Sequence, residues 1–171
     1  MDLKTFDTVG KTFPYLVDKS KATGGGFVGS LRFVVFDNNT TFSVGDLEIK
    51  SFSVEHGISS DGLPFMCNSF KMENIVYMSD VNFVPKDVIP DLLDLDLLLL
   101  DCLREGPPYL SHFILSDVYK LLSIIKPKKT LLVGMSHSLE HYHFKQLLSS
   151  HSLSIEPSRD GQRIQFNSHH R

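Results

Sequence analysis

The stretch Ile75-Val76-Tyr77-Met78-Ser79-Asp80 decides the fold that this sequence predicts. Four strand-forming residues lead to a serine and then to a carboxylate, which is how α/β proteins present a ligand at the rim of a sheet. Three other apolar runs end in a similar way, at His56, Asp101 and His137. Imidazole and carboxylate are the ligands that zinc, manganese and iron prefer. If the runs are strands of one sheet, the pattern predicts a metal site at its rim.

Length and composition limit the classes of protein to consider. With 171 residues and a net charge of −3, the chain is one domain with a real core and gives no reason to expect nucleic-acid binding. Cys67 and Cys102 lie in apolar runs without CxxC spacing, which is typical of buried thiols in a reducing compartment. We find neither an 18-residue apolar window nor a signal peptide. The sequence favours a cytoplasmic protein without a membrane segment.

Hydrophobic periodicity predicts alternating helices and strands in the second half of the chain. Helices are expected at 2–9, 86–92, 116–125 and 140–148, with Ser116 as an N-cap and Pro90 as a break. Strands are expected at 31–36, 42–54, 64–70, 74–78, 94–101, 130–137, 153–156 and 163–166. The Gly24-Gly25-Gly26 triplet predicts a flexible loop, because no Lys-Ser/Thr pair follows it as a phosphate loop requires. This order of elements is typical of an α/β fold.

Each candidate ligand has an ordinary explanation when it is taken alone. His56 precedes Gly57 and fits a loop, and Asp80 fits the cap of a turn. His112 follows a Pro-Pro segment and fits an exposed position, while His137 belongs to a histidine-rich stretch that fits a surface cluster. The combination favours a metal site, because several such residues fall at the ends of strands.

The order of these motifs resembles the metallo-β-lactamase superfamily. The motifs are His-Gly at 56–57, Ser-Asp at 79–80, Leu-Asp at 100–101, Ser-His at 111–112, Gly-Met-Ser-His at 134–137 and Glu-His at 140–141. Within the superfamily, the chain is most similar to the branch of the bacterial cyclic-phosphate phosphodiesterase of phosphonate breakdown and its plant and fungal relatives. The stretch Lys-Thr-Phe-Pro-Tyr-Leu-Val at 11–17 resembles the same relatives. The similarity covers residues 2–166.

The resemblance implies metal-dependent hydrolysis of a small phosphodiester or another phosphate-containing substrate. It implies three ligands of up to two divalent ions, zinc or manganese: His56, Asp80 and His137, with Asp80 bridging. His112 would be the general acid or a contact to the substrate phosphate, and Asp101 would hold a ligand imidazole in its useful tautomer. His141, one helical turn after His137, competes with it for the ligand role.

One motif of the superfamily, HxHxDH, has no counterpart here, since the first histidine is His56. The chain therefore resembles the C-terminal two-thirds of a member, as a shortened isoform, an incomplete gene model or a degenerate copy would. We predict an α/β fold, a metallo-β-lactamase-like αββα sandwich incomplete at the N-terminus, with residues 1–171 as a single partial domain.

Two functions of different classes follow from this prediction. The first is a metal-dependent hydrolase of the phosphodiesterase type, whose dinuclear metal site is incomplete in this chain. The second is a non-catalytic paralogue or truncated isoform, which binds a protein partner or a second copy over an exposed sheet. A tRNA-processing nuclease shares the ligand set, but the chain has no basic arm for gripping RNA.

Overall fold

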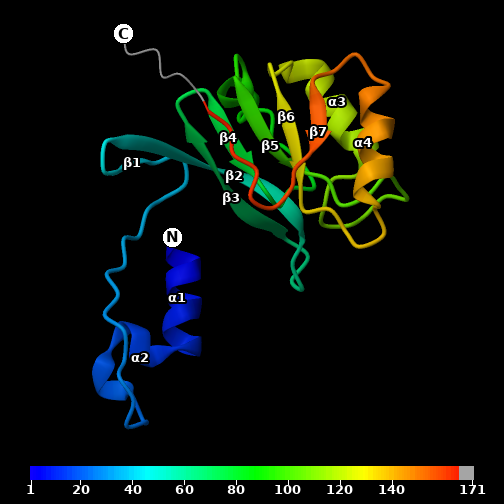
Figure 1. Ribbon diagram of the computed structural model, residues 1–171. Helices are drawn as coiled ribbons and strands as arrows, with labels where there is room; N and C mark the ends of the chain where they lie inside the picture. Colours follow the sequence, from blue (N-terminus) through cyan, green and yellow to red (C-terminus); the bar gives the residue numbers. More distant parts are fainter. Residues whose placement is uncertain (166–171) are drawn as a thin grey trace.

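A mixed sheet of seven strands forms the centre of the computed structural model, which describes residues 1–165 (Figure 1). The strands lie side by side in sequence order: β1 (Thr41–Val44), β2 (Leu47–Ile58), β3 (Pro64–Met72), β4 (Ile75–Met78), β5 (Leu97–Asp101), β6 (Thr130–Val133) and β7 (Ile155–Pro157). Strands β1 to β4 pair antiparallel, and β4 to β7 pair parallel. The α/β class predicted from the sequence is confirmed.

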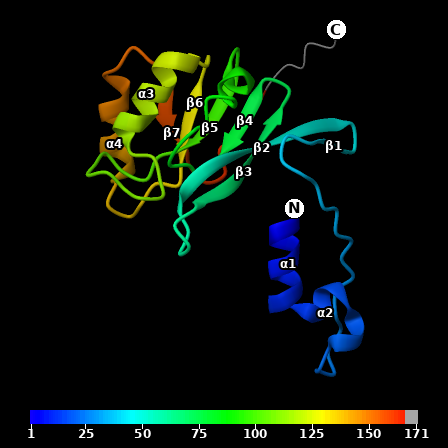
Figure 2. The ribbon, with the colours of Figure 1, turned by 180° about the vertical axis from the view of Figure 1, so that it is seen from behind.

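The parallel half is built from crossovers that carry helices. Helix α3 (Leu115–Ile125) connects β5 to β6, and α4 (His141–Ser149) connects β6 to β7. Both helices lie on the same face of the sheet (Figures 1 and 2). The connection from β4 to β5 contains the 3-10 helix η2 (Ile89–Leu92), which is short because Pro90 cannot supply an amide to a longer helix.

The hydrophobic core lies between these helices and the sheet. Alternating residues of the strands point toward it, as the two-residue period of a strand requires. The sheet contributes Phe52, Val54, Val76, Met78, Leu98, Leu100 and Leu132, and the helices contribute Val118, Leu121, Leu122, Ile125, Phe144 and Leu148. Burial of this face fixes the register of the strands, since a slip of one residue would expose every core side chain.

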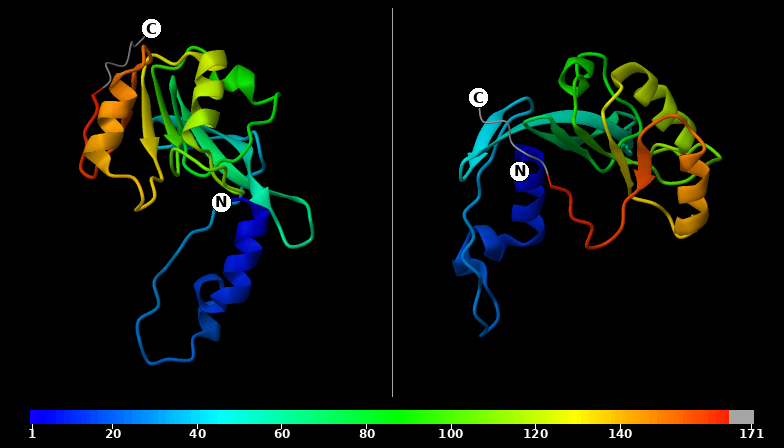
Figure 3. Two further views of the ribbon diagram at one scale, coloured as in Figure 1. Left: turned by 90° about the vertical axis from the view of Figure 1, so that its right-hand side faces the viewer. Right: turned by 45° about the horizontal axis from the view of Figure 1, so that its top comes forward.

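The N-terminal part lies on the other side of the sheet, beside β1 to β3 (Figure 3). It contains α1 (Leu3–Thr12), α2 (Pro14–Val17) and the 3-10 turn η1 (Lys19–Lys21). Asp2 caps α1 by accepting a hydrogen bond from the Thr5 amide at 2.7 Å, and it accepts another from Asn68 Nδ2 at 2.7 Å. Polar contacts at Asp2 therefore attach this helix to β3.

Several expected elements differ in the structure. The strand expected at 31–36 does not form: the Met1 ammonium donates to the Val34 carbonyl and the Phe36 amide donates to the Met1 carbonyl, so this segment pairs with the start of the chain. Ile114, not Ser116, is the N-cap of α3. Residues 163–165 are irregular, and Phe166 lies outside the described residues. None of the described helices is long and apolar enough to cross a membrane.

Candidate metal centre

Three potential ligands meet at one edge of the sheet, where β2 and β4 both end. The side chains of His56, Asp80 and His112 each offer a ligand atom, and these atoms lie within 4.8 Å of one another. Each of the three residues is half-buried. They come from three separate segments, so the meeting is a product of the fold. Among residues 1–165, these three residues form the group whose ligand atoms have the spacing of a metal site.

His56 is aimed at this edge by an irregularity in β2. The pairing with β3 shifts between Glu55 and Ile58, and Gly57 has a φ of +108°, which a side chain would oppose. Such a bulge turns the side chain beside it. The Glu55 carbonyl accepts hydrogen bonds from the amides of Asn82 and Phe83, which holds β2 against the segment that follows Asp80. The Nδ1 atom of His56 is buried and has no hydrogen-bond partner among the described residues.

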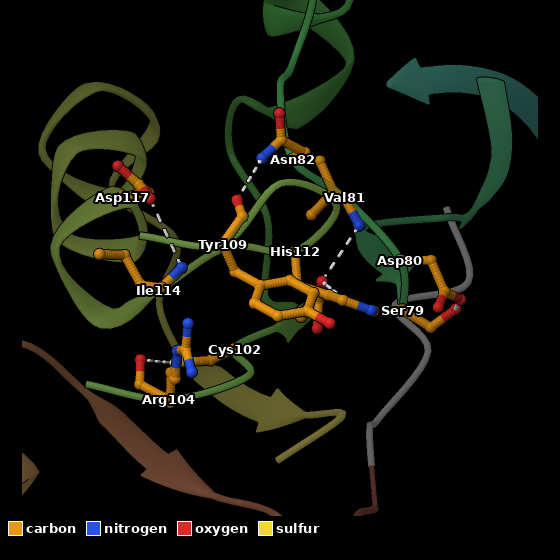
Figure 4. A network of polar contacts seen from close by, with 11 residues as sticks. Ser79, Asp80, Val81, Asn82, Cys102, Arg104, Tyr109, His112, Ile114 and Asp117 are labelled. Carbon is orange, nitrogen blue, oxygen red and sulfur yellow. Dashed lines mark hydrogen bonds and ion pairs between the residues drawn. The ribbon is translucent and has the colours of Figure 1, made fainter. Parts of the chain in front are cut away.

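Asp80 follows the last residue of β4 by two positions. The Ser79 hydroxyl donates to its Oδ2 atom at 2.6 Å. Figure 4 shows Asp80 and Ser79 on one side of His112 and Arg104 on the other.

His112 lies in the loop between β5 and α3, which neighbouring polar groups hold in shape. Arg104 Nε donates to the Pro107 carbonyl at 3.0 Å. Asn82 Nδ2 donates to the Tyr109 carbonyl at 3.1 Å (Figure 4). A Cβ atom at Gly57 would lie only 3.1 Å from the Leu110 carbonyl oxygen. The absence of a side chain at Gly57 therefore allows the loop to bring His112 against His56.

Asp101 supports His112 from the interior. Its carboxylate is fully buried, and Oδ2 accepts a hydrogen bond from His112 Nδ1 at 2.7 Å and from the Val81 amide at 3.2 Å. Burial raises the pKa of Asp101 to about 6, although the Val81 amide and His112 act in the opposite direction. The carboxylate is mostly ionised at neutral pH. It fixes the tautomer of His112, so that Nε2 is left for another partner.

Gly134, just after β6, makes room for this carboxylate. Its φ is +72°, and a Cβ atom there would lie 2.7 Å from Asp101 Oδ1. Any other residue would combine backbone strain with a collision against a buried charged group.

The donor set fits one divalent ion. Two imidazoles and one carboxylate are ligands of the kind that catalytic zinc sites use, with a water molecule in the remaining position. The buried Nδ1 atom of His56 lacks a partner among residues 1–165, and a metal bond would supply one. The bond from His112 to Asp101 has the arrangement by which a carboxylate orients a metal-binding imidazole.

His137 is the sequence-predicted ligand that the structure does not bring into this group. Strand β6 ends at Val133, four residues earlier than the pattern predicts, because Gly134 turns the backbone with its positive φ. His137 therefore lies in an exposed turn. His141 is engaged elsewhere: its Nε2 atom is 3.0 Å from the Ser158 carbonyl oxygen. His56 and Asp80 converge as expected, but the third member of the group is His112 and not His137.

His112 is the residue whose position carries most new information. The family resemblance implies a role for His112 at this site, and the structure places its side chain within ligand distance of His56 and Asp80. The Ser-His pair before a helix and the Asp101 strand end are the signals in the sequence, but their side-chain contact depends on the folded loop. Sequence reasoning also passes over Gly57 and Gly134, whose importance comes from close approaches in space.

Comparisons with known proteins match the fold. No protein-family model and no curated protein matches the sequence. A diphosphatase of the PhnP family has a solved structure with a TM-score of 0.78 and 19% identity, covering 97% of this chain and 57% of its own. The metallo-β-lactamase fold protein YhfI from Bacillus subtilis has a TM-score of 0.67 and 15% identity, covering 91% of this chain and 61% of its own. The chain has a metallo-β-lactamase fold.

A third solved structure of this kind contains a metal ion. Zn²⁺-bound PqqB from Methylobacterium extorquens has a TM-score of 0.62 and 14% identity, with 78% of this chain and 55% of its own covered. The chain thus spans between about half and two-thirds of the length of these three structures. The superfamily resemblance of the sequence is confirmed at the level of the fold, which appears here as one sheet with two helices over one face.

Proposed function

We propose that this chain is a metal-dependent hydrolase, acting on a phosphodiester or another phosphate-containing substrate. The observation that carries the proposal is the group of His56, Asp80 and His112, with the buried Asp101 behind His112. The diphosphatase among the similar structures supports a phosphate-containing substrate. A bound zinc or manganese ion would supply Lewis-acid polarisation of a phosphoryl oxygen and a lowered pKa of bound water.

The residues of the chain have separate roles in this proposal. His56 and Asp80 hold the metal ion, and Asp101 keeps the Nδ1 proton on His112. With Nε2 unprotonated, His112 is a third ligand; with Nε2 protonated, it donates a proton to the leaving oxygen as a general acid. His137 is proposed as the ligand of a second ion that Asp80 would bridge, reached by movement of its exposed turn.

Metal content and turnover test the proposal together. Elemental analysis of the purified 171-residue protein is combined with an assay of bis(4-nitrophenyl) phosphate in added Mn²⁺ or Zn²⁺. We expect weak metal binding and low turnover, because this chain offers three clustered ligands where two ions need about three each. Asp80→Asn should abolish both, whereas Asp46→Asn, in an exposed turn, should change neither. Equal metal content in the Asp80 variant and the wild type would refute the metal centre.

His112→Ala separates the two roles of this histidine. As a general acid, His112 would contribute about 10²–10⁴-fold to turnover, and the variant would keep its metal. If His112 is a ligand, the variant would lose metal together with activity. The exposed His143→Ala, on the solvent side of α4, is the matched control and should retain both properties.

A second candidate function, binding of a protein partner or a second copy, is favoured by the open face of the sheet. Phe42, Ile49, Phe70, Met72 and Tyr77 line an apolar hollow of about 300 Å³ there. Light scattering over a range of concentrations tests the second-copy form. A dimer that Tyr77→Glu dissociates would support it, and a monomer at all concentrations would exclude self-association.

A further inference from the structure

A cleft of about 600 Å³ lies between α1 and the open face of β2 and β3. Its apolar lining includes Val9, Phe36 and Met66, and its polar lining includes Lys4, Ser53 and Asn68. A volume of this size is in the range of small-molecule sites, which combine an apolar wall with a few polar groups.

Phe65 connects this cleft to the candidate metal centre. Its side chain lines the cleft, and its ring centroid lies 6.1 Å from that of His56. The imidazoles of His56 and His112 are then 4.6 Å apart, in an edge-to-face arrangement. A molecule with one end at the metal centre could therefore extend past Phe65 into the cleft.

Lys4 supplies a positive charge at this junction. Its Nζ atom lies 5.6 Å from the centroid of the Phe65 ring, in the range of a cation–π contact. Lys4 forms no ion pair within residues 1–165. Two carboxylates of this region accept hydrogen bonds from other donors: Asp2 from the Thr5 amide and Asn68, and Asp61 from the Ser59 hydroxyl and the Leu63 amide.

Arg104 lies on the other side of the histidines and differs from Lys4 in its hydrogen bonds. Its guanidinium carbon lies 5.0 Å from the centroid of the Tyr109 ring, and Lys4 Nζ lies 5.6 Å from that of Phe65. However, Arg104 also donates to the carbonyls of Pro107 and Pro108, so its hydrogen-bonding capacity holds the loop. Of these two cations, Lys4 is the one that remains available to a ligand.

We propose that the cleft binds the non-reacting organic group of an organophosphate, with Lys4 contacting the phosphate. The inference rests on the proposed function for the place of the reacting phosphate, which would lie beside Phe65 at the edge of the candidate metal centre. The apolar organic group lies against Val9, Phe36 and Met66. Lys4 is thus a specificity-determining residue, and free phosphate without an organic group should bind more weakly than its ester.

Titration of metal-free protein with phenyl phosphate, followed by amide NMR shifts, tests this directly. We expect shifts at Lys4, Thr5 and Phe65, and weaker binding of both inorganic phosphate and phenol. Lys4→Ala should raise the dissociation constant for phenyl phosphate by about two- to fivefold, the range of an exposed ion pair. Lys4→Arg should stay close to the wild type. Lys11→Ala, at the far end of the same helix, is the matched control and should have no effect.

A second variant tests the cleft without changing Lys4. Met66→Glu places a negative charge in the lining and should weaken phenyl phosphate binding at least as much. Unchanged affinity in both the Lys4→Ala and Met66→Glu proteins, or absence of binding to the wild type, would overturn the inference. Because these titrations contain no metal, failure of the Asp80 metal test would refute the proposed function without altering their result.

Discussion

The helix-covered half of the sheet and the N-terminal part of the chain are stabilised in different ways. Strands β4 to β7 pack against α3 and α4 through fully buried side chains such as Leu98 and Phe144. Helices α1 and α2 contain no buried residue, and Leu3, Phe13 and Val17 are exposed there. The N-terminal part depends instead on polar contacts of Met1 and Asp2 and on aromatic contacts of Phe36 with Phe42 and Phe70. Burial therefore orders one region, and a few local contacts attach the other.

The candidate site lies where these two regions meet. Asp101 and the loop of His112 belong to the helix-covered half, and their positions are fixed by burial and backbone contacts. Lys4 belongs to the attached region and is exposed. The comparison predicts that substitutions in the first region act on folding, whereas those in the second act on ligand affinity.

The largest effect should come from removing a buried aromatic side chain. Phe144→Ala deletes a ring of zero exposure between α4 and the sheet, and should lower the free energy of unfolding by about 3–5 kcal/mol. Phe13→Ala removes a ring that is 44% exposed, and should lower it by less than about 1 kcal/mol. Urea unfolding followed by circular dichroism measures both. Equal losses of the free energy of unfolding in the two variants would show that the N-terminal part belongs to the hydrophobic core, contrary to the difference between the two regions.

Two glycines with positive φ differ in the space around them and extend the comparison to the backbone. Gly134→Ala should lower the free energy of unfolding by about 2–3 kcal/mol, because backbone strain is added to the collision of Cβ with Asp101 Oδ1. Gly45→Ala, in the turn between β1 and β2, has a φ of +60° and open space around Cβ, so only about 1 kcal/mol of strain is expected. Urea midpoints report the difference. If the two variants were equally stable, the close approach to Asp101 would have no energetic consequence.

Elements that bury one apolar face could be predicted from the sequence. The periodicity of α3 and the continuous apolar run of β5 each allow one way of packing. The observed α3 begins one residue before the expected range, and β5 begins three residues later than expected but ends at Asp101 as predicted. The 31–36 segment has equally strand-like residues but no neighbouring strand to pair with, and it remains irregular. A local pattern cannot report whether such a partner exists.

The residues of the candidate site differ in the same way in how far the sequence predicts their positions. His56 and Asp80 follow strands whose ends are set by the sheet, and they meet as the pattern predicts. His137 was expected to continue β6, but its place depends on the turn at Gly134. The contact of His112 with Asp101 depends on a loop closed by Arg104 and Asn82, which no local signal in the sequence reports.

The pH dependence of stability gives the smallest and most specific test. The ordinary pKa of an aspartate is 3.8, and burial raises that of Asp101 to about 6 in the folded protein. Between these values the folded protein binds more protons than the unfolded chain, so the free energy of unfolding falls as pH rises from about 4 to about 6. The loss is at most about 3 kcal/mol, and the opposing contributions of His112 and the Val81 amide are already contained in the pKa of about 6.

Asp101→Asn isolates this contribution, because asparagine has nearly the same shape and no titration. Urea midpoints of the two metal-free proteins are compared at pH 4, 5, 6 and 7. All other carboxylates are common to both proteins, so the stability of the wild type relative to Asp101→Asn should decline across this interval and level off above it. A difference that rose with pH would mean that the folded protein favours the charged form of Asp101. The hydrogen bonds that Asp101 accepts from His112 and the Val81 amide would then stabilise the carboxylate more strongly than burial destabilises it.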